Sequence, residues 1–132
     1  MNQSAFLIPW FVVVPLAAAF VNSLIGRRIS GLSAVVACLT TFSLLGLSLV
    51  ATQFVRINTT LVYHVGGWKP SIGIAMVLDG LTAFMLVTVN MVAFVIAVYA
   101  TDYMERFTSQ AMFYTLLLLM LSGMNGVIVA GD

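Results

Sequence analysis

The sequence predicts an all-α integral membrane protein with four transmembrane helices and a β-ribbon-like loop on the outer side. Apolar residues make up 62% of the chain and charged residues 7%, against about 25% charged in a soluble domain. The interiors of four stretches lack Asp, Glu, Lys and Arg; these are 5–25, 32–55, 80–100 and 111–130. Because a helix rises about 1.5 Å per residue, each stretch can cross a hydrocarbon core of roughly 30 Å. We expect residues 1–132 to form a single membrane domain.

The first two helices are expected over about 5–25 and 32–55. Pro9 and Trp10 suit the first turn of a helix at the headgroup level. Pro15 lies inside the first span and should kink it or loosen a turn. Along the second helix, mostly small side chains recur four and three residues apart and predict one packing face; they are Ala34, Cys38, Thr41, Leu45, Ser48 and Thr52.

The connection at 56–78 carries two alternating runs around Gly66-Gly67. Leu61, Tyr63 and Val65 alternate before the glycines, and Ile72, Ile74 and Met76 alternate after them. Period-two patterns flanking a glycine pair predict a β-hairpin or an extended ribbon.

The third helix, over about 79–100, is expected to begin at Asp79, whose carboxylate would accept hydrogen bonds from free backbone amides. The alternative role of Asp79 is an ion-entrance carboxylate. Asn90 in this helix and Asn125 in the fourth are expected to form hydrogen bonds between helices, or alternatively to line a water path. The candidate residues for an ion path or a helix interface are therefore Asp79, Asn90, Asn125 and Asp132.

The fourth helix, over about 111–130, carries small residues on one side. Gly123, Gly126 and Ala130 predict a close-packing face, which we interpret as a contact with another subunit. Arg27 and Arg28 lie in the short first connection, so the positive-inside rule places that connection in the cytoplasm and the N-terminus outside.

The residue types present exclude several chemistries. The net charge of +1 provides no basic surface for nucleic acid. With a single Cys38 and a single His64, we expect no bound metal, haem or other cofactor. The chain resembles four-helix drug exporters in length, but their substrate glutamate in the first helix is missing here. By itself the chain is not expected to be an enzyme.

Two motifs resemble a known family. The segment Gly66-Gly67-Trp68-Lys69-Pro70 with the later Asp79-Gly80-Leu81 is similar to the outer loop and third-helix start of antiporter-like membrane subunits. These occur in Mrp-type cation/proton antiporters, membrane-bound hydrogenases and respiratory complex I. The ending Gly123-Met124-Asn125-Gly126, through Gly131-Asp132, resembles the end of the fourth helix in the D-type antiporter subunit.

The resemblance implies a membrane complex that moves protons or cations, in which the chain supplies the leading helices. A full member has about fourteen helices, with two inverted repeats, and its proton path uses a glutamate on the fifth helix and a lysine on the seventh. The sequence reaches Asp132 before both positions, so no such residue can be assigned here. We therefore expect an N-terminal fragment or split subunit in the cell membrane, with other membrane subunits as partners, including a chain that supplies the following helices. The parent complex would be an antiporter or a redox-driven enzyme; a purely structural or assembly subunit is the alternative.

Overall fold

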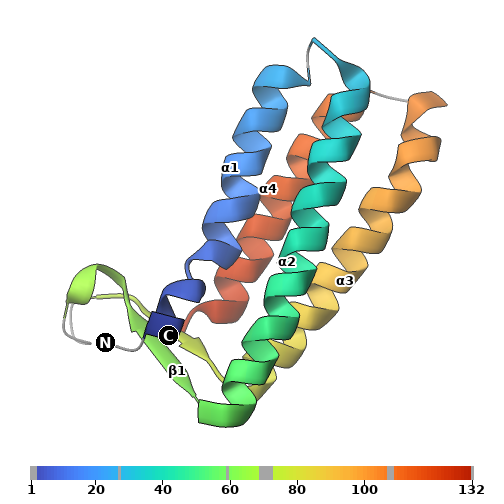
Figure 1. The fold of residues 1–132 in the computed structure, drawn as a ribbon. Helices are drawn as coiled ribbons and strands as arrows, with labels where there is room; N and C mark the ends of the chain where they lie inside the picture. Colours follow the sequence, from blue (N-terminus) through green and yellow to red (C-terminus); the bar gives the residue numbers. More distant parts are fainter. Residues whose placement is uncertain (1–2, 27, 59, 69–72, 107–108, 132) are drawn as a thin grey trace.

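The computed structural model describes residues 3–26, 28–58, 60–68, 73–106 and 109–131. In this part of the chain, four long helices lie side by side and connect alternately at opposite ends (Figure 1). They are α1 (Trp10–Ile25), α2 (Ser30–Asn58), α3 (Gly80–Tyr103) and α4 (Gln110–Val129). Four segments are long and apolar enough to cross a membrane, which confirms the predicted four spans; they are Ala5–Ile25, Gly31–Ile57, Gly80–Tyr103 and Gln110–Val129, the first of which includes the turns that precede α1. A 3-10 helix, η1 (Gln3–Leu7), precedes α1, so the α-helix begins five residues later than expected.

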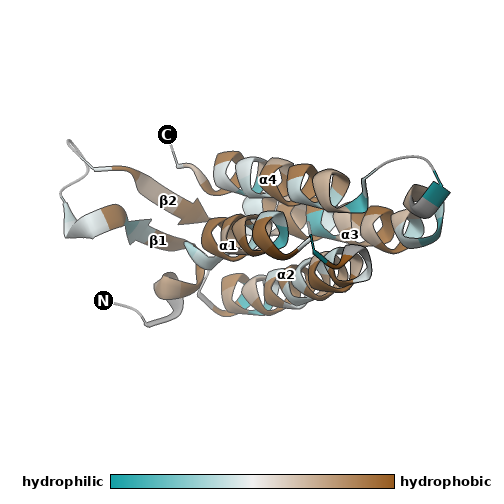
Figure 2. Cartoon of the chain, turned by 90° about the horizontal axis from the view of Figure 1, so that it is seen from above, coloured by the Kyte–Doolittle hydropathy of each residue, from teal (hydrophilic) through white to brown (hydrophobic). Residues whose placement is uncertain are grey.

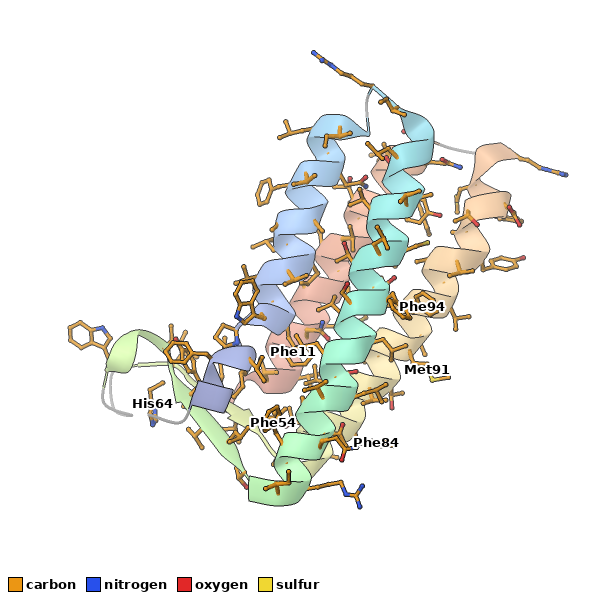
Figure 3. All side chains as sticks on the ribbon, in the orientation of Figure 1. Phe11, Phe54, His64, Phe84, Met91 and Phe94 are labelled. Carbon is orange, nitrogen blue, oxygen red and sulfur yellow. The ribbon has the colours of Figure 1, made fainter. Side chains whose placement is uncertain are left out.

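The predicted ribbon is an antiparallel hairpin at one end of the bundle, which we call the hairpin end. Strand β1 (Leu61–His64) pairs with β2 (Ala75–Leu78), and Leu61 lies opposite Leu78. A short 3-10 turn, η2 (Val65–Gly67), follows β1, and both of its glycines have positive φ. The segment 69–72 lies outside the described residues, so the middle of the expected loop motif has no structural description. His64 projects from the hairpin and is exposed (Figure 3).

The end of α4 adds to this small sheet. Ala130 forms a bridge with Met76, and the Gly131 N–H donates to the Ala75 carbonyl over 2.9 Å. On the other strand, the Tyr63 ring packs on Phe6 of η1 with centroids 5.6 Å apart. The hairpin therefore ties together the beginning of the chain, the α2–α3 connection and the end of α4.

Within the bundle, α1 packs most extensively on α4 and α2 on α3. Figure 2 shows apolar colour on the outer as well as the inner faces of the helices, as expected when lipid covers the outside. Large side chains such as Phe84 and Met91 of α3 are exposed. The buried core contains Phe11, Leu44, Leu86 and Leu121 near the hairpin end. The second core cluster, around Tyr114 and Leu118, occupies the other half.

The predicted packing face of α2 is shifted by one residue at most positions. Thr41 and Ser48 are buried as expected, but Ala34 and Cys38 are only partly buried. The buried face contains Ser33, Ala37, Thr41, Leu44, Ser48, Ala51 and Val55. The shift has a physical reason: α2 carries small residues on neighbouring faces as well, and the sequence pattern alone does not select between them.

Candidate functional site

A group of buried polar side chains joins three helices in the hairpin-side half of the bundle. We call Asn90 of α3 with Ser122 and Asn125 of α4 the polar seam. Asn90 and Asn125 have no exposed surface, and Ser122 is 4% exposed. In the α-helical periodicity, Ser122 and Asn125 lie on one face of α4, and this face is directed at α1.

The two amides of the polar seam bind each other in both directions. Asn90 Nδ2 donates to Asn125 Oδ1, and Asn125 Nδ2 donates to Asn90 Oδ1, each over 3.3 Å. Asn90 Nδ2 also donates to the Leu86 carbonyl over 2.8 Å. Asn125 Nδ2 also donates to the Phe11 carbonyl of α1 over 3.2 Å, and Ser122 Oγ donates to the Val12 carbonyl over 2.9 Å.

These hydrogen bonds determine what the polar seam can do chemically. A carboxamide nitrogen carries two hydrogens, and both hydrogens of each Asn have an acceptor. A carboxamide does not titrate near neutral pH, so the pair cannot hold or release a proton as a carboxylate or histidine does. Because both side chains lack exposed surface and their amide hydrogens all have protein acceptors, the geometry favours the helix-packing role over the alternative of lining a water path.

A second buried contact joins α1 and α4 near the opposite end, where residues 26–29 and 104–109 connect the helices. Asn22 Nδ2 donates to Thr115 Oγ1 over 3.2 Å and to the Ala111 carbonyl over 3.4 Å. Asn22 Oδ1 and Ser33 Oγ are buried without a partner among the described residues. Sequence reasoning missed Asn22, although a lone Asn inside an apolar span indicates a bundle-facing position.

Asp79 caps α3, as predicted. Its Oδ1 accepts the Thr82 backbone N–H over 2.7 Å, and this hydrogen bond holds the pKa of the Asp79 carboxyl below its ordinary value. Asp79 lies at the hairpin end, about 16 Å along the helix axis from Asn90. The structure therefore does not bring Asp79 and the polar seam together. Asp132, the remaining candidate on an ion path, lies outside the described residues.

The three small residues predicted as a subunit-packing face of α4 do not share one environment. Gly123 is exposed, and a Cβ added there would meet nothing within 4 Å. Gly126 is half-buried, and its added Cβ would lie 3.7 Å from Val12 Cγ2 of α1. Ala130 is exposed but bridges to Met76 of the hairpin. Only Gly123 lies on an open part of α4.

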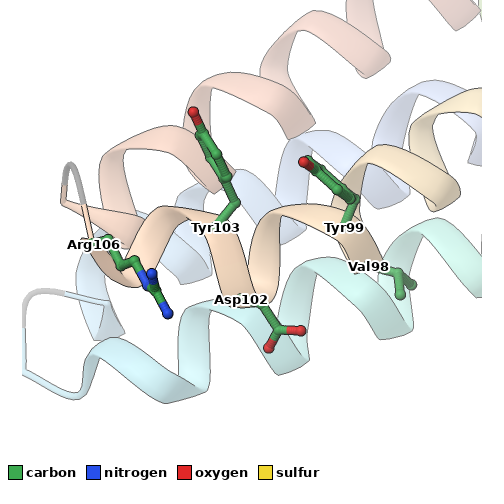
Figure 4. A pocket seen from close by; sticks show the side chains of 5 residues that line it. All are labelled: Val98, Tyr99, Asp102, Tyr103 and Arg106. Carbon is green, nitrogen blue, oxygen red and sulfur yellow. The ribbon is translucent and has the colours of Figure 1, made fainter.

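A shallow pocket of about 550 Å³ lies at the last turns of α3 (Figure 4). It is lined by Val98, Tyr99, Asp102, Tyr103 and Arg106, and the two tyrosine rings stack with centroids 5.9 Å apart. Tyrosines and charges at the end of a span are typical of the membrane–water interface. Among the described residues, no group of three or more His, Cys, Asp or Glu side chains could hold a metal ion.

The fold and the polar seam define a multi-pass membrane protein with a neutral, hydrogen-bonded interior. Its sequence is similar to several known membrane proteins. Residues 64–114 match the family model described as the N-terminus of NADH-ubiquinone oxidoreductase (complex I) chain 5. The D-type component of a probable K(+)/H(+) antiporter from Rhizobium meliloti (strain 1021) is 30% identical over 127 residues, covering 92% of this chain and 23% of the relative. The N-type component of NADH-quinone oxidoreductase from Desulforudis audaxviator (strain MP104C) is 35% identical over 94 residues, covering 65% and 19%.

Solved structures show the same arrangement. A chain of the Mrp complex from Dietzia sp. DQ12-45-1b matches with a TM-score of 0.88 and 27% identity, covering all of this chain and 24% of that one. A chain of the membrane-bound sulfane sulfur reductase, an archaeal respiratory membrane complex, matches in fold with a TM-score of 0.87 at 23% identity, covering 95% and 26%. The chain is therefore similar to the N-terminal part of antiporter-like membrane subunits, as its motifs indicated. It spans about a quarter or less of the length of these relatives.

Proposed function

We propose that this chain forms the leading helices of an antiporter-like module in a multi-subunit complex of the cell membrane, and that it supports proton or cation translocation without conducting ions itself. The segments that its relatives carry beyond the matched part would supply the titratable residues of the path. The chain would have no catalytic activity of its own. Its N-terminus and hairpin would face outward, with Arg28 on the cytoplasmic side.

One observation carries this proposal: the buried polar side chains of the described residues are all neutral. They are Asn22, Ser33, Thr41, Ser48, Asn90, Gln110, Ser122 and Asn125, together with Tyr114, whose hydroxyl donates to the Ala97 carbonyl over 3.1 Å. Proton-moving membrane proteins place titratable side chains inside the span, where they are costly and functional. Amides and hydroxyls instead join helices in lipid. The interior of these four helices is thus suited to holding a module together.

The similar proteins suggest two kinds of parent complex. Two of them are named as parts of an antiporter or of an Mrp complex, and another is a component of an oxidoreductase. We favour cation/proton exchange because the antiporter component aligns with 92% of this chain, against 65% for the oxidoreductase component. A redox-driven complex is the second candidate.

The open part of α4 is the proposed contact with the following helices of the module. Gly123 has free space above its backbone, with exposed Met120, Met124 and Val127 nearby on the same helix. A glycine with no neighbour inside the chain lets a second helix backbone approach closely. Gly126 is less suitable as a contact with another subunit, because a Cβ added there would already lie 3.7 Å from Val12 Cγ2 of α1.

The test is Gly123→Leu in the chain expressed in its native membrane and purified by an affinity tag. We expect the variant to keep its own fold but to lose co-purifying membrane subunits. Gly46→Leu is the matched control: an added Cβ at Gly46 in α2 also has nothing within 4 Å, and because the proposal assigns the contact to α4, this change should leave the assembly intact. Full recovery of the subunits with Gly123→Leu would contradict the proposed contact. If both variants lost the co-purifying subunits, the contact would not be specific to α4, and the proposed location would be wrong.

A further inference from the structure

The strongest feature that this function does not explain is the pairing of the polar seam with one particular turn of α1. Pro15 lies inside α1 and is buried. Proline has no backbone N–H, so a proline in a helix interior leaves the carbonyl four residues earlier without its usual donor. In α1 that carbonyl belongs to Phe11.

The Phe11 carbonyl receives its hydrogen bond from another helix. Asn125 Nδ2 of α4 donates to it over 3.2 Å, from a side chain with no exposed surface. One residue further, Ser122 Oγ donates to the Val12 carbonyl over 2.9 Å. Both α4 donors therefore meet α1 within the turn that Pro15 interrupts.

We propose that Pro15 and Asn125 act as one unit, an amide clamp in which Asn125 replaces the backbone donor that Pro15 lacks and thereby fixes the register of α1 against α4. The Asn90 amide completes the clamp from α3, because it uses the second hydrogen of Asn125 and the free oxygen of the same side chain. A flip of the Asn125 amide would bring Oδ1 against the Phe11 carbonyl, which has no hydrogen to donate. One orientation is thus selected.

The clamp has a consequence that ordinary packing would not have. The contribution of Asn125 to the stability of the fold should depend on residue 15, because an alanine there would restore the missing N–H. In the natural chain, replacing Asn125 leaves a buried carbonyl unpaired, which in lipid has no water to replace the donor. With Pro15→Ala, the Phe11 carbonyl regains a donor inside α1. Replacing Asn125 in that background should therefore reduce the stability of the fold much less.

The experiment is a double-mutant cycle on the full chain in bicelles, with the unfolding equilibrium measured by denaturant titration. Asn125→Leu keeps the branched shape and the number of side-chain heavy atoms and removes the amide donor and acceptor; the larger volume of leucine is common to both backgrounds. We expect this substitution to raise the unfolding constant roughly fivefold to tenfold in the Pro15 background, and by about half of that factor or less after Pro15→Ala. Asn22→Leu is the control, because Asn22 also joins α1 to α4 through a buried amide, but at Thr115 and the Ala111 carbonyl and not at the Phe11 turn; its effect should be the same in both backgrounds.

A second measurement reads the carbonyl itself. A ¹³C=¹⁸O label at Phe11 separates the infrared amide band of this carbonyl from the other amide bands. The labelled band moves to higher frequency when the carbonyl loses a hydrogen bond. We expect that shift with Asn125→Leu in the Pro15 background and its absence when Ala occupies position 15. Equal effects of Asn125→Leu in both backgrounds, or an unchanged Phe11 band, would overturn the clamp. Both readouts concern this chain alone, so they are independent of the parent complex.

Discussion

Gly26, at the end of α1, offers the sharpest test of how α1 and α4 pack. It is buried, and its φ of −63° is open to any residue, so its requirement is space. A Cβ added at Gly26 would lie closest to Ser33 Oγ, 2.6 Å from the Asn22 carbonyl oxygen and 2.7 Å from Ala111 Cβ. The Ser33 hydroxyl can rotate away. The Asn22 carbonyl belongs to α1 itself, so that contact can ease only if the last turn of α1 changes. The contact with Ala111 can ease only if α1 and α4 separate.

The expected cost follows from these distances. Overpacking of this kind costs about 1–3 kcal/mol, and because Gly26 is the C-cap and not an interior residue of α1, the better helix propensity of alanine returns little of this cost. Gly26→Ala should therefore destabilise the chain by about 1–3 kcal/mol, which raises the unfolding constant roughly 5- to 150-fold. The assay is denaturant titration in bicelles.

Gly46→Ala is the matched control for this change. Gly46 lies inside α2 with nothing within 4 Å of its added Cβ, so alanine should be neutral or slightly stabilising there. If Gly26→Ala behaves like Gly46→Ala, the close approach of α1 and α4 at Ala111 is wrong.

Two further predictions concern the hairpin end. Gly131→Ala should loosen the contact between α4 and β2, because the added Cβ would lie 2.5 Å from Val77 Cγ2 and 2.8 Å from the Ala75 carbonyl oxygen; amide exchange in β2 should accelerate, whereas Gly80→Ala, with nothing within 4 Å, should not change it. Asp79→Ala should cost about 1 kcal/mol by removing the cap of α3, and Asp79→Ser should restore most of it. Because the folded-state pKa of Asp79 is lowered, its stabilisation is present above the ordinary pKa of 3.8 and is lost as the pH falls through the lower folded value; a titration in which Asp79→Ala keeps the same acid-side loss would contradict this role.

Hydropathy and period-two alternation were sufficient to predict the four spans and the hairpin. The cap at Asp79 could also be predicted, because its hydrogen bond with Thr82 is local in sequence. The packing face of α2 could not be predicted, because lipid is as apolar as the protein core and hydrophobicity does not separate the inner from the outer face of a span.

The polar seam was only half predictable. An Asn inside an apolar span predicts a hydrogen bond to a neighbouring helix, and Asn90 and Asn125 follow that rule. Their mutual pairing depends on how α3 crosses α4, and the partner of Asn125 on α1 is a backbone carbonyl, which has no signature of its own in sequence. Pro15 was the one available hint, because it marks the turn where a carbonyl loses its donor.

Reconstitution tests the central proposal most directly. The purified chain in liposomes, under an imposed pH gradient and with sodium or potassium outside, should dissipate the gradient no faster than empty vesicles, because the buried polar groups of its described spans are neutral. The same assay on the complex that co-purifies with it should show cation-coupled proton flux. Robust cation-coupled proton flux from the chain alone would contradict the account.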